Sequence, residues 1–325
     1  MQRSIGRWAC VLTLALWAAA EPSLQPMWLG QEGGVVYVVE HGVLVCIDLK
    51  TMQVLARRTL LRGPGPWDNR LVVARSDDGL SFTGTGVTVA EGGGVPDLMY
   101  DAQGRLVAIF QYFPQDSEEE FDHIAVAFST DEGQSWTKPR VISISGLPAT
   151  AARAPCDPDL VLLADGRVRL YFTCDVHADR RGTPRTLSAV AEDCLSFQLE
   201  EGERFADPPH PVLDPSALRI GDTWHLYVPR MAPGAPAYHL VSGDGLQFRR
   251  LDDIRVPGVD FRGNVVPVPG GYRFFGCGQP GLSTAFSQDG SQWRPERTRA
   301  VPGLGDPAVI RLKDGTYLMV HMERR

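Results

Sequence analysis

The sequence predicts an all-β fold of five repeated units, a five-bladed β-propeller with an N-terminal β-hairpin appendage. Two repeats lead to this prediction. A short phrase that ends in Phe or Trp recurs five times, and a second phrase, centred on Pro in four of its five copies, recurs out of phase with it. The closing aromatics lie 45 to 61 residues apart, at Phe82, Trp136, Phe197, Phe248 and Trp293. Periods near 50 residues built from short strands are typical of propellers, in which each repeat is one four-stranded blade.

The first repeat predicts a turn between antiparallel strands. Its copies share the order Ser-x-Asp-Gly-x-x-aromatic, with an extra residue in the second and substitutions in the third; they begin at Ser76, Ser129, Ala191, Ser242 and Ser287. Asp accepts hydrogen bonds from the backbone amides just ahead of it, and Gly adopts positive φ without steric cost. The aromatic residue then opens the next strand, where it can pack between blades.

The second repeat predicts the first strand of each unit. Its copies are Val95-Pro96-Asp97, Asp157-Pro158-Asp159, Asp214-Pro215-Ser216, Arg262-Gly263-Asn264 and Asp306-Pro307-Ala308. An apolar run, a Gly turn and another apolar run follow each copy, so that a unit contains strands A to D. Residues 71–89 supply a spare C and D at the N-terminus, and residues 305–322 a spare A and B at the C-terminus. We expect them to share one blade, because circular closure leaves no open sheet edge.

The first 20 residues have the pattern of a signal peptide. Arg3 and Arg7 form a charged start, residues 8–17 an apolar core, and Ala18-Ala19-Ala20 a small-residue cleavage site. An uncleaved membrane anchor is the alternative, but the apolar run is short for a membrane span. We therefore expect cleavage near Ala20, a secreted or periplasmic protein, and no membrane span after cleavage.

A separate strand segment, residues 27–61, precedes the propeller at residues 67–325. Residues 35–39, 43–48 and 53–56 have the composition of three short strands. They form either part of a sixth blade or an appended hairpin. The appendage is favoured because the five later units already close.

Composition excludes several classes of partner and cofactor. The net charge is −7, and no Lys/Arg cluster marks a nucleic-acid groove. No His/Cys/Glu spacing indicates zinc, and a structural Ca²⁺ ion has no supporting pattern. We expect a monomer without a cofactor. Five cysteines remain after cleavage; Cys156 and Cys174 either form a cross-strand disulfide or stay reduced.

The long B–C and D–A loops share one face of the predicted propeller, and long loops over a rigid scaffold usually carry the binding site. The A strands begin at that face, around the central channel. Alternate side chains of a strand point the same way. The mouth of the channel should therefore present five carboxylates and one cation, namely Asp97, Asp157, Asp159, Asp214, Asp306 and Arg262.

The chain resembles the furanosidase-like glycoside hydrolases, which include arabinanases, β-xylosidases, levansucrases and invertases. The resemblance covers residues 67–325 and rests on the Asp-Pro strand starts and the Ser-x-Asp-Gly-x-x-Phe/Trp turns. Residues 129–136 also match a sialidase-type Asp box. The resemblance implies two acidic catalysts and a third carboxylate that tunes one of them, since glycoside hydrolysis needs one protonated and one ionised carboxyl group.

Each role that the resemblance implies is assigned to a residue of this chain by its position in the repeated units. Asp97 matches the base or nucleophile, and Asp159 or Asp157 matches the tuning carboxylate. The third blade departs from the family pattern, because it offers Asp214 where a Glu commonly serves as the acid. Asp157, Asp306 and Arg262 at the mouth, with Arg153 and His177 in long loops, are candidate substrate ligands. For each residue the alternative is structural: an Asp before Pro often caps its own turn, and Arg262 can pair with a mouth carboxylate.

Three functions follow. The favoured one is an exported glycosidase that acts on an oligosaccharide or polysaccharide. A sialidase-like exo-glycosidase would need three arginines to grip a carboxylate, for which Arg153, Arg230 and Arg262 are the candidates. A catalytically silent propeller that binds glycans or proteins is the third, and the absence of Glu from the third blade favours it.

Overall fold

The computed structural model describes residues 27–32, 34–40, 43–51, 53–59, 65–148, 151, 154–176, 183–232, 235–277, 281–300 and 304–324. The predicted signal peptide lies outside these residues. The chain divides into two compact units, one of Met1–Gly65 with Gln115–Glu119 and one of Pro66–Pro114 with Glu120–Arg325. In the part of the chain described, no helix is both long and apolar enough to cross a membrane.

The described strands of the N-terminal unit form one antiparallel sheet in the order β1-β2-β3-β4. They are β1 (Met27–Glu32), β2 (Val35–Glu40), β3 (Val43–Asp48) and β4 (Val54–Thr59). The last three correspond to the predicted strands, whereas β1 was not predicted. A register shift between Trp28 and Gly30 interrupts the pairing of β1 with β2.

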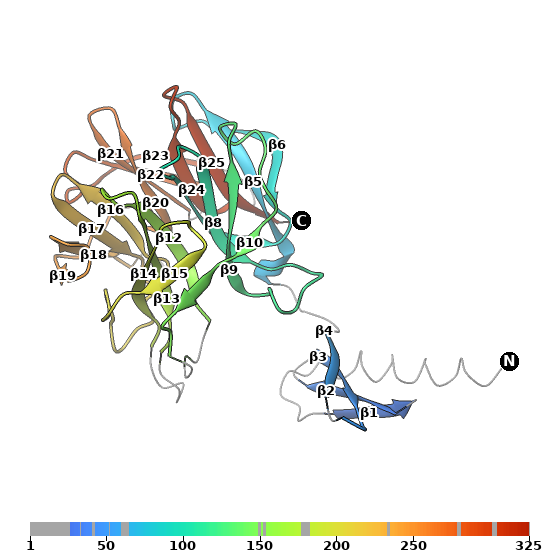
Figure 1. The fold of residues 1–325 in the computed structure, drawn as a ribbon. Coiled ribbons are helices and arrows are strands. Elements are labelled where there is room, and N and C mark those ends of the chain that lie inside the picture. Colours follow the sequence, from blue (N-terminus) through green and yellow to red (C-terminus); the bar gives the residue numbers. More distant parts are fainter. Residues whose placement is uncertain are drawn as a thin grey trace. The chain divides into compact units, whose positions relative to one another are not determined.

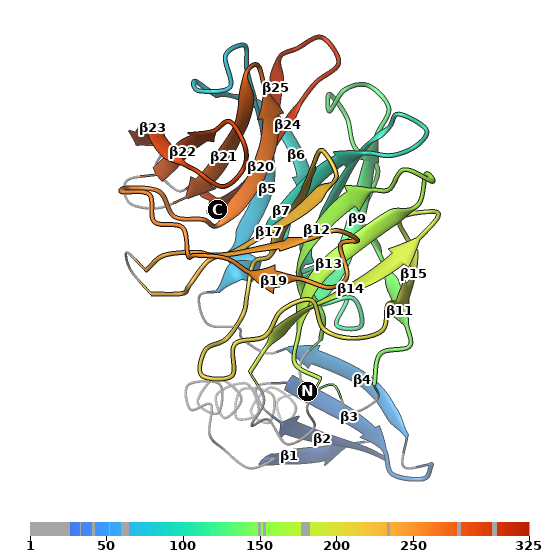
Figure 2. The same cartoon turned by 90° about the vertical axis from the view of Figure 1, so that its left-hand side faces the viewer.

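The described strands of the second unit form five sheets arranged as a propeller (Figures 1 and 2). Blade I contains β7 (Gly93–Tyr100), β8 (Leu106–Tyr112), β9 (His123–Ser129) and β10 (Arg140–Val141). Blade II contains β12 (Cys156–Leu162), β13 (Val168–Cys174), β14 (Arg185–Ala191) and β15 (Ser196–Leu199), and β11 (Ser143–Ser145) joins its edge parallel to β15.

Blade III contains β16 (Ser216–Ile220), β17 (Thr223–Val228), β18 (Tyr238–Ser242) and β19 (Arg249–Arg250). Blade IV contains β20 (Gly263–Val268), β21 (Gly271–Cys277), β22 (Gly281–Ser287) and β23 (Arg294–Ala300). Blade V contains β24 (Gly305–Arg311) and β25 (Tyr317–Arg324), followed in the sheet by β5 (Asn69–Ser76) and β6 (Thr83–Ala90). A short 3₁₀ helix, η1 (Pro66–Asp68), precedes β5.

Blade V closes the ring with strands from both ends of the propeller. β25 pairs antiparallel with β5 from Tyr317 opposite Ser76 to Arg324 opposite Asn69. The prediction of five blades with a shared closing blade is therefore confirmed. The innermost strands β7, β12, β16, β20 and β24 contact one another in this cyclic order, so that the edge of each sheet at the centre of the ring is protected by its neighbours.

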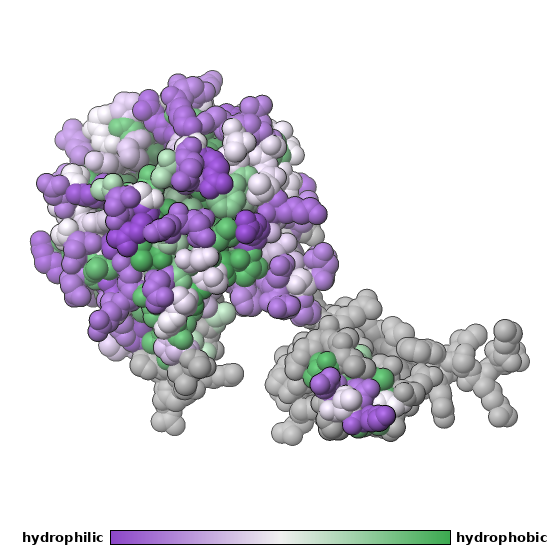
Figure 3. All heavy atoms as spheres, in the orientation of Figure 1, coloured by the Kyte–Doolittle hydropathy of each residue, from purple (hydrophilic) through white to green (hydrophobic). Residues whose placement is uncertain are grey.

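The apolar core lies between the blades. Each of five buried clusters combines side chains from two neighbouring blades. The aromatic residue that ends each repeated phrase packs in the cluster shared with the preceding blade; Phe82, for example, makes an edge-to-face contact with Phe275 at 6.1 Å. On the face visible in Figure 3, hydrophilic residues predominate and hydrophobic ones show in smaller areas between them.

The repeated Asp turns have the predicted chemistry. In the fourth copy, Asp244 Oδ1 accepts hydrogen bonds from the amides of Leu246 and Gln247 at 2.8 and 2.9 Å. The turns also link the blades: the Tyr171 hydroxyl of blade II donates to the Gly245 carbonyl of blade III at 2.8 Å, and Tyr227 donates to Gly290 at 2.7 Å. These turns thus hold neighbouring blades in register at the face opposite the long loops.

Candidate functional site

In the described part of the chain, the inner strands of four blades begin with the same strained backbone conformation. The residue before proline has a positive φ in each of them, at 45° for Val95, 51° for Asp157, 51° for Asp214 and 36° for Asp306. Sterics disfavour this conformation for residues other than Gly, and a following proline disfavours it further. Register shifts accompany the residue in β7, β12 and β24. Such bulges re-aim side chains, so the regular alternation assumed from the sequence does not apply at these strand starts.

Blade IV differs from the other four, because its positive φ falls on a glycine at the proline position and not on the residue before it. Gly263 replaces the proline of the other blades and has φ of 142°. A Cβ atom at this position would lie 2.1 Å from the Phe275 carbonyl oxygen and 3.0 Å from that of Pro307. Only glycine fits so close an approach of backbones. Arg262, which precedes it, therefore occupies the position that Asp or Val holds in the other blades.

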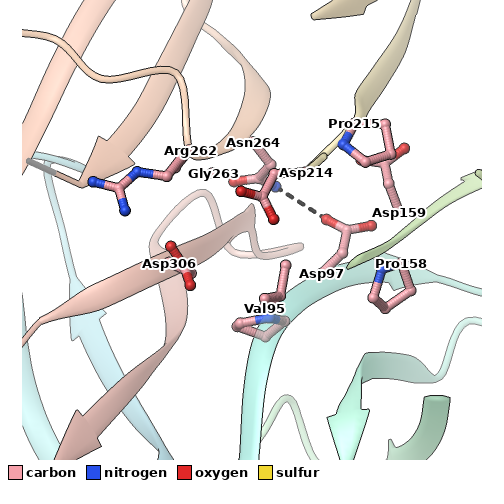
Figure 4. Close-up of a pocket in the computed structure, with 11 residues that line it drawn as sticks. Val95, Asp97, Pro158, Asp159, Asp214, Pro215, Arg262, Gly263, Asn264 and Asp306 are labelled. Atoms are coloured by element: carbon pink, nitrogen blue, oxygen red, sulfur yellow. Dashed lines mark hydrogen bonds between the residues drawn. The ribbon is translucent and has the colours of Figure 1, made fainter. Parts of the chain in front are cut away.

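A small axial pocket lies among these strand starts (Figure 4). Its volume is about 20 Å³, which is room for about one water molecule. The polar residues that line it are Asp97, Asp159, Asp214, Arg262, Asn264 and Asp306. The structure thus brings together five of the predicted site residues. Asp157 does not line the pocket, but its Oδ2 lies 3.4 Å from the Asp214 amide nitrogen. Arg153 and His177 lie outside the described residues.

Two of the predicted catalytic carboxylates link neighbouring blades. Asp97 Oδ2 accepts a hydrogen bond from the Leu160 amide of blade II at 2.8 Å, and Asp159 Oδ2 accepts one from the Ala217 amide of blade III at 3.0 Å. Asn264 repeats the link between blades IV and V, where its Oδ1 accepts from the Val309 amide at 2.9 Å and its amide group donates to the Val309 carbonyl. Sequence analysis assigned no role to Asn264, although it holds the same repeat position as the two aspartates.

Burial makes Asp97 and Asp159, here called the inner carboxylates, hard to ionise. Desolvation raises the pKa of Asp97 to about 7, although hydrogen bonds from Leu160, Leu98 and Asn264 act against the rise. The pKa of Asp159 lies well above its ordinary value because of its burial and the nearby charge of Asp97. Two buried carboxylates that repel each other cannot both ionise easily. The pair therefore keeps a proton near neutral pH.

Three further carboxylates, here called the outer carboxylates, form a second group around Arg262. They are Asp214, Asp260 and Asp306. Burial raises the pKa of Asp214 well above its ordinary value, and the charges of Asp157 and Asp306 raise it further. Burial also raises the pKa of Asp306, against the opposing charge of Arg262. Arg262 donates from Nε and Nη2 to Asp260 Oδ2 at 3.1 and 2.8 Å. Its carboxylate partner is therefore Asp260, a residue that sequence analysis did not select.

A much larger cavity, here called the wide groove, adjoins the axial pocket. Its volume is about 800 Å³. It is formed by residues 229–232, 254–262 and 304–306, with 235, 237, 277 and 322. Arg262 and Asp306 line both cavities, so that the two are contiguous. Among the described residues, no group of three His, Cys, Asp or Glu side chains is placed to hold a metal ion.

Comparison by sequence gives no relative: no protein-family model matches the chain. No curated protein matches it either. Comparison by structure finds similar proteins. A Dyadobacter fermentans protein of unknown function superposes with a TM-score of 0.57 and 13% identity over 92% of this chain and 94% of that one.

Two glycoside hydrolases are also similar in structure. A family 43 β-xylosidase/α-arabinofuranosidase from a compost microbial metagenome, solved with xylotriose, gives a TM-score of 0.55 and 14% identity over 70% of this chain and 84% of that one. A Bombyx mori family 32 β-fructofuranosidase gives 0.51 and 15% over 70% and 54%. The protein is a five-bladed β-propeller with structural neighbours among the family 43 and family 32 glycoside hydrolases.

Proposed function

We propose that the protein is an exported glycoside hydrolase that binds a carbohydrate at the propeller mouth and cleaves its glycosidic bond there. The observation that carries the proposal is the presence of two carboxyl groups of different environment on one water-sized pocket. Asp97 accepts a hydrogen bond that links two blades, whereas Asp214 belongs to the group of carboxylates around Arg262. Glycosidases need such a pair, one carboxyl protonated and the other ionised.

In this proposal Asp214 is the general acid. Burial, and then the charges of Asp157 and Asp306, raise its pKa well above the ordinary value, which favours the protonated form that can donate a proton to the leaving-group oxygen. Asp97 is the base and removes a proton from a water molecule held in the axial pocket. Burial, and then the charge of Asp97, raise the pKa of Asp159; in this proposal Asp159 carries the proton of the pair when Asp97, whose pKa is about 7, is ionised. A base that acts through water implies inversion, with the two carboxyl groups roughly 6.5–9.5 Å apart.

The structural neighbours support a carbohydrate as the ligand. One was solved with xylotriose, and another, an N-acetylgalactosamine deacetylase from F. plautii, with blood group B trisaccharide. Both share the fold with this chain at no more than 14% identity. The signal-peptide pattern of residues 1–20 supports export to a compartment where such glycans occur.

A hydrolysis screen tests this function. The protein from residue 21 onward would be assayed against nitrophenyl glycosides and oligosaccharides, with Asp214→Asn and Asp97→Asn as matched variants of unchanged size. We expect turnover of at least one substrate, and a loss of at least 100-fold in each variant, since general acid–base catalysis contributes about 10²–10⁴. Turnover that survives Asp214→Asn would remove that residue as the acid.

One observation favours a second function, carbohydrate binding without hydrolysis. Blades II, III and V have Asp before the strand-start proline, but blade I has Val95. The mouth therefore lacks a carboxylate at that position of the ring. Binding of a glycan that is never cleaved, detected by ligand-observed NMR, would establish this function. A sialidase-like site is not proposed, because Arg230 pairs with Asp253 and Arg262 pairs with Asp260, both at 2.8 Å.

A further inference from the structure

The wide groove differs in chemistry from the mouth that it adjoins. Five charged residues line it, namely Arg230, Arg255, Asp260, Arg262 and Asp306, and most of its remaining wall is aliphatic; this part includes Met231, Ile254, Val256, Val259, Leu304 and Met322. Met231 is 49% exposed although it is a large apolar side chain. A cavity of about 800 Å³ lies within the range of about 300–1,000 Å³ that is usual for small-molecule sites. The space therefore suits an organic group larger than the water that fits the axial pocket.

The lining does not suit a further row of sugar rings. No Trp or Tyr lines the groove, and its single aromatic residue, Phe261, is 4% exposed. Aromatic side chains with one apolar face and one polar edge are the groups best able to contact both the flat face and the hydroxyls of a sugar. Sugar hydroxyls along aliphatic walls would lose their hydrogen bonds to water without replacement.

An anionic ligand is also disfavoured. Three arginines line the groove, but Arg230 is paired with Asp253, and Arg262 with Asp260. The guanidinium of Arg230 lies 4.4 Å from the ring centre of Tyr238 and is held in place there. The mouth end carries Asp260 and Asp306. An anion would thus meet two arginines that are already paired with carboxylates, and the carboxyl groups of Asp260 and Asp306, which disfavour it.

We propose that the sugar bound at the mouth carries an aliphatic aglycone that lies in the wide groove. This inference rests on the function proposed above and narrows its substrate class to alkyl-type glycosides. Arg262 and Asp306 belong to both cavities and mark the junction, where the glycosidic oxygen joins the sugar to the aglycone. The polar head contacts the carboxylates of the mouth, and the chain removes the exposed apolar walls from water.

The test compares methyl, butyl and octyl glycosides of the same sugars, each below its micelle-forming concentration. Dissociation constants, or KM where turnover occurs, are measured for the protein from residue 21 onward. Affinity should rise with each methylene by up to about fourfold, the factor that corresponds to full burial of a CH₂ group. Met231→Asp and Ala232→Trp should reduce the octyl-to-methyl affinity ratio, the first by adding charge and the second by filling space.

Leu162→Asp is the matched control, since Leu162 is a comparably exposed apolar residue, at 40%, outside the groove. It should leave the ratio unchanged. Methyl glycosides that bind as well as octyl glycosides would overturn the inference while the proposed function stands. The same holds if added sugar units, but not added methylenes, increase affinity. If no glycoside of any chain length binds, the proposed function fails and this inference with it.

Discussion

Asp97 and Asp214 illustrate how the same residue type serves two purposes within one pocket. Asp97 accepts a backbone hydrogen bond from the next blade, as Asp159 and Asn264 do, whereas Asp214 stands before a proline with a positive φ. The first arrangement is a structural link that is also available to catalysis. The second is a strained backbone, which persists only where the surroundings impose it, and we expect it to aim the Asp214 carboxyl group at the mouth.

Two substitutions separate the structural and chemical roles of Asp97. Asn keeps an oxygen that can accept from the Leu160 amide, so Asp97→Asn should unfold near the wild-type temperature but lack turnover. Ala removes the acceptor and leaves a buried amide unpaired, which costs about 1–3 kcal/mol of unfolding free energy. Thermal denaturation and hydrolysis assays check both. An Asp97→Ala protein as stable as the wild type would show that the link contributes nothing.

The ionisation of Asp97 should appear in the pH dependence of stability. Its folded pKa of about 7 exceeds the ordinary value of 3.8, so the folded state holds the proton more tightly. The stability from this proton is complete below the unfolded pKa and is lost as pH rises through the folded one. The Asp97→Asn variant has no such proton to lose. The melting temperature of the variant relative to wild type should therefore increase from roughly pH 5 to pH 8; a constant difference would contradict the raised pKa.

At the scale of elements, the Asp turns do more than reverse the chain. Three of the turns place a glycine carbonyl within reach of a side chain on the preceding blade: Gly79 accepts from Arg273, Gly245 from Tyr171 and Gly290 from Tyr227. Arg169 likewise donates to the Asp244 carbonyl at 3.0 Å. Turns of this kind tie the periphery of the ring together, while the links at Asp97, Asp159 and Asn264 tie its centre.

Replacing a turn glycine should reveal this contact. Both Gly290 and Gly221 have positive φ, at 76° and 58°. A Cβ atom at Gly290 would lie 2.3 Å from Ile220 Cδ1 and 2.9 Å from the Tyr227 hydroxyl, whereas at Gly221 nothing lies within 4 Å. Gly221→Ala should cost about 1 kcal/mol from backbone strain alone. Gly290→Ala should cost at least twice as much, and equal losses in denaturant unfolding would argue against the packing described.

The same elements show what the sequence can predict. The Asp turns and the strand starts repeat, and repetition made the blades, their order and the closing blade recognisable before any coordinates. The link at Asn264 was not recognisable, because its partner Val309 comes from another part of the chain. Asp260 lies only two residues from its partner Arg262, but it belongs to no repeat. The wide groove combines residues 229–232, 254–262 and 304–306. Apart from Arg262 and Asp306 at the strand starts, these residues follow no repeat, and their apolar side chains read as core in a sequence.

At the scale of the whole molecule, the propeller unit has all its apolar clusters between blades. The cluster of blades V and I includes Leu71, Leu98 and Leu318, which come from opposite ends of the unit. Stability of one blade therefore depends on both neighbours. Because the ring is closed, the loss of a single strand in blade V should affect every blade interface.

Two truncations test this dependence. A chain that ends at Asp314 lacks β25, leaving β5 and β24 without their common partner, and should fail to give a soluble monomer, since exposed strand edges promote aggregation. A chain that begins at Pro66 keeps every strand of the propeller and should melt cooperatively near the temperature of the full protein. Size-exclusion chromatography and thermal denaturation check both. A soluble, cooperatively folded protein ending at Asp314 would contradict the closure argument.

The shared blade V also sets the order in which the protein can be made. The ribosome synthesises β5 and β6 at the start of the propeller, but β25, which pairs with β5, is the last of the described strands to be made. Until β25 is made, β5 lacks the strand that covers its edge. The ring can therefore close only after every other strand of the propeller has been synthesised.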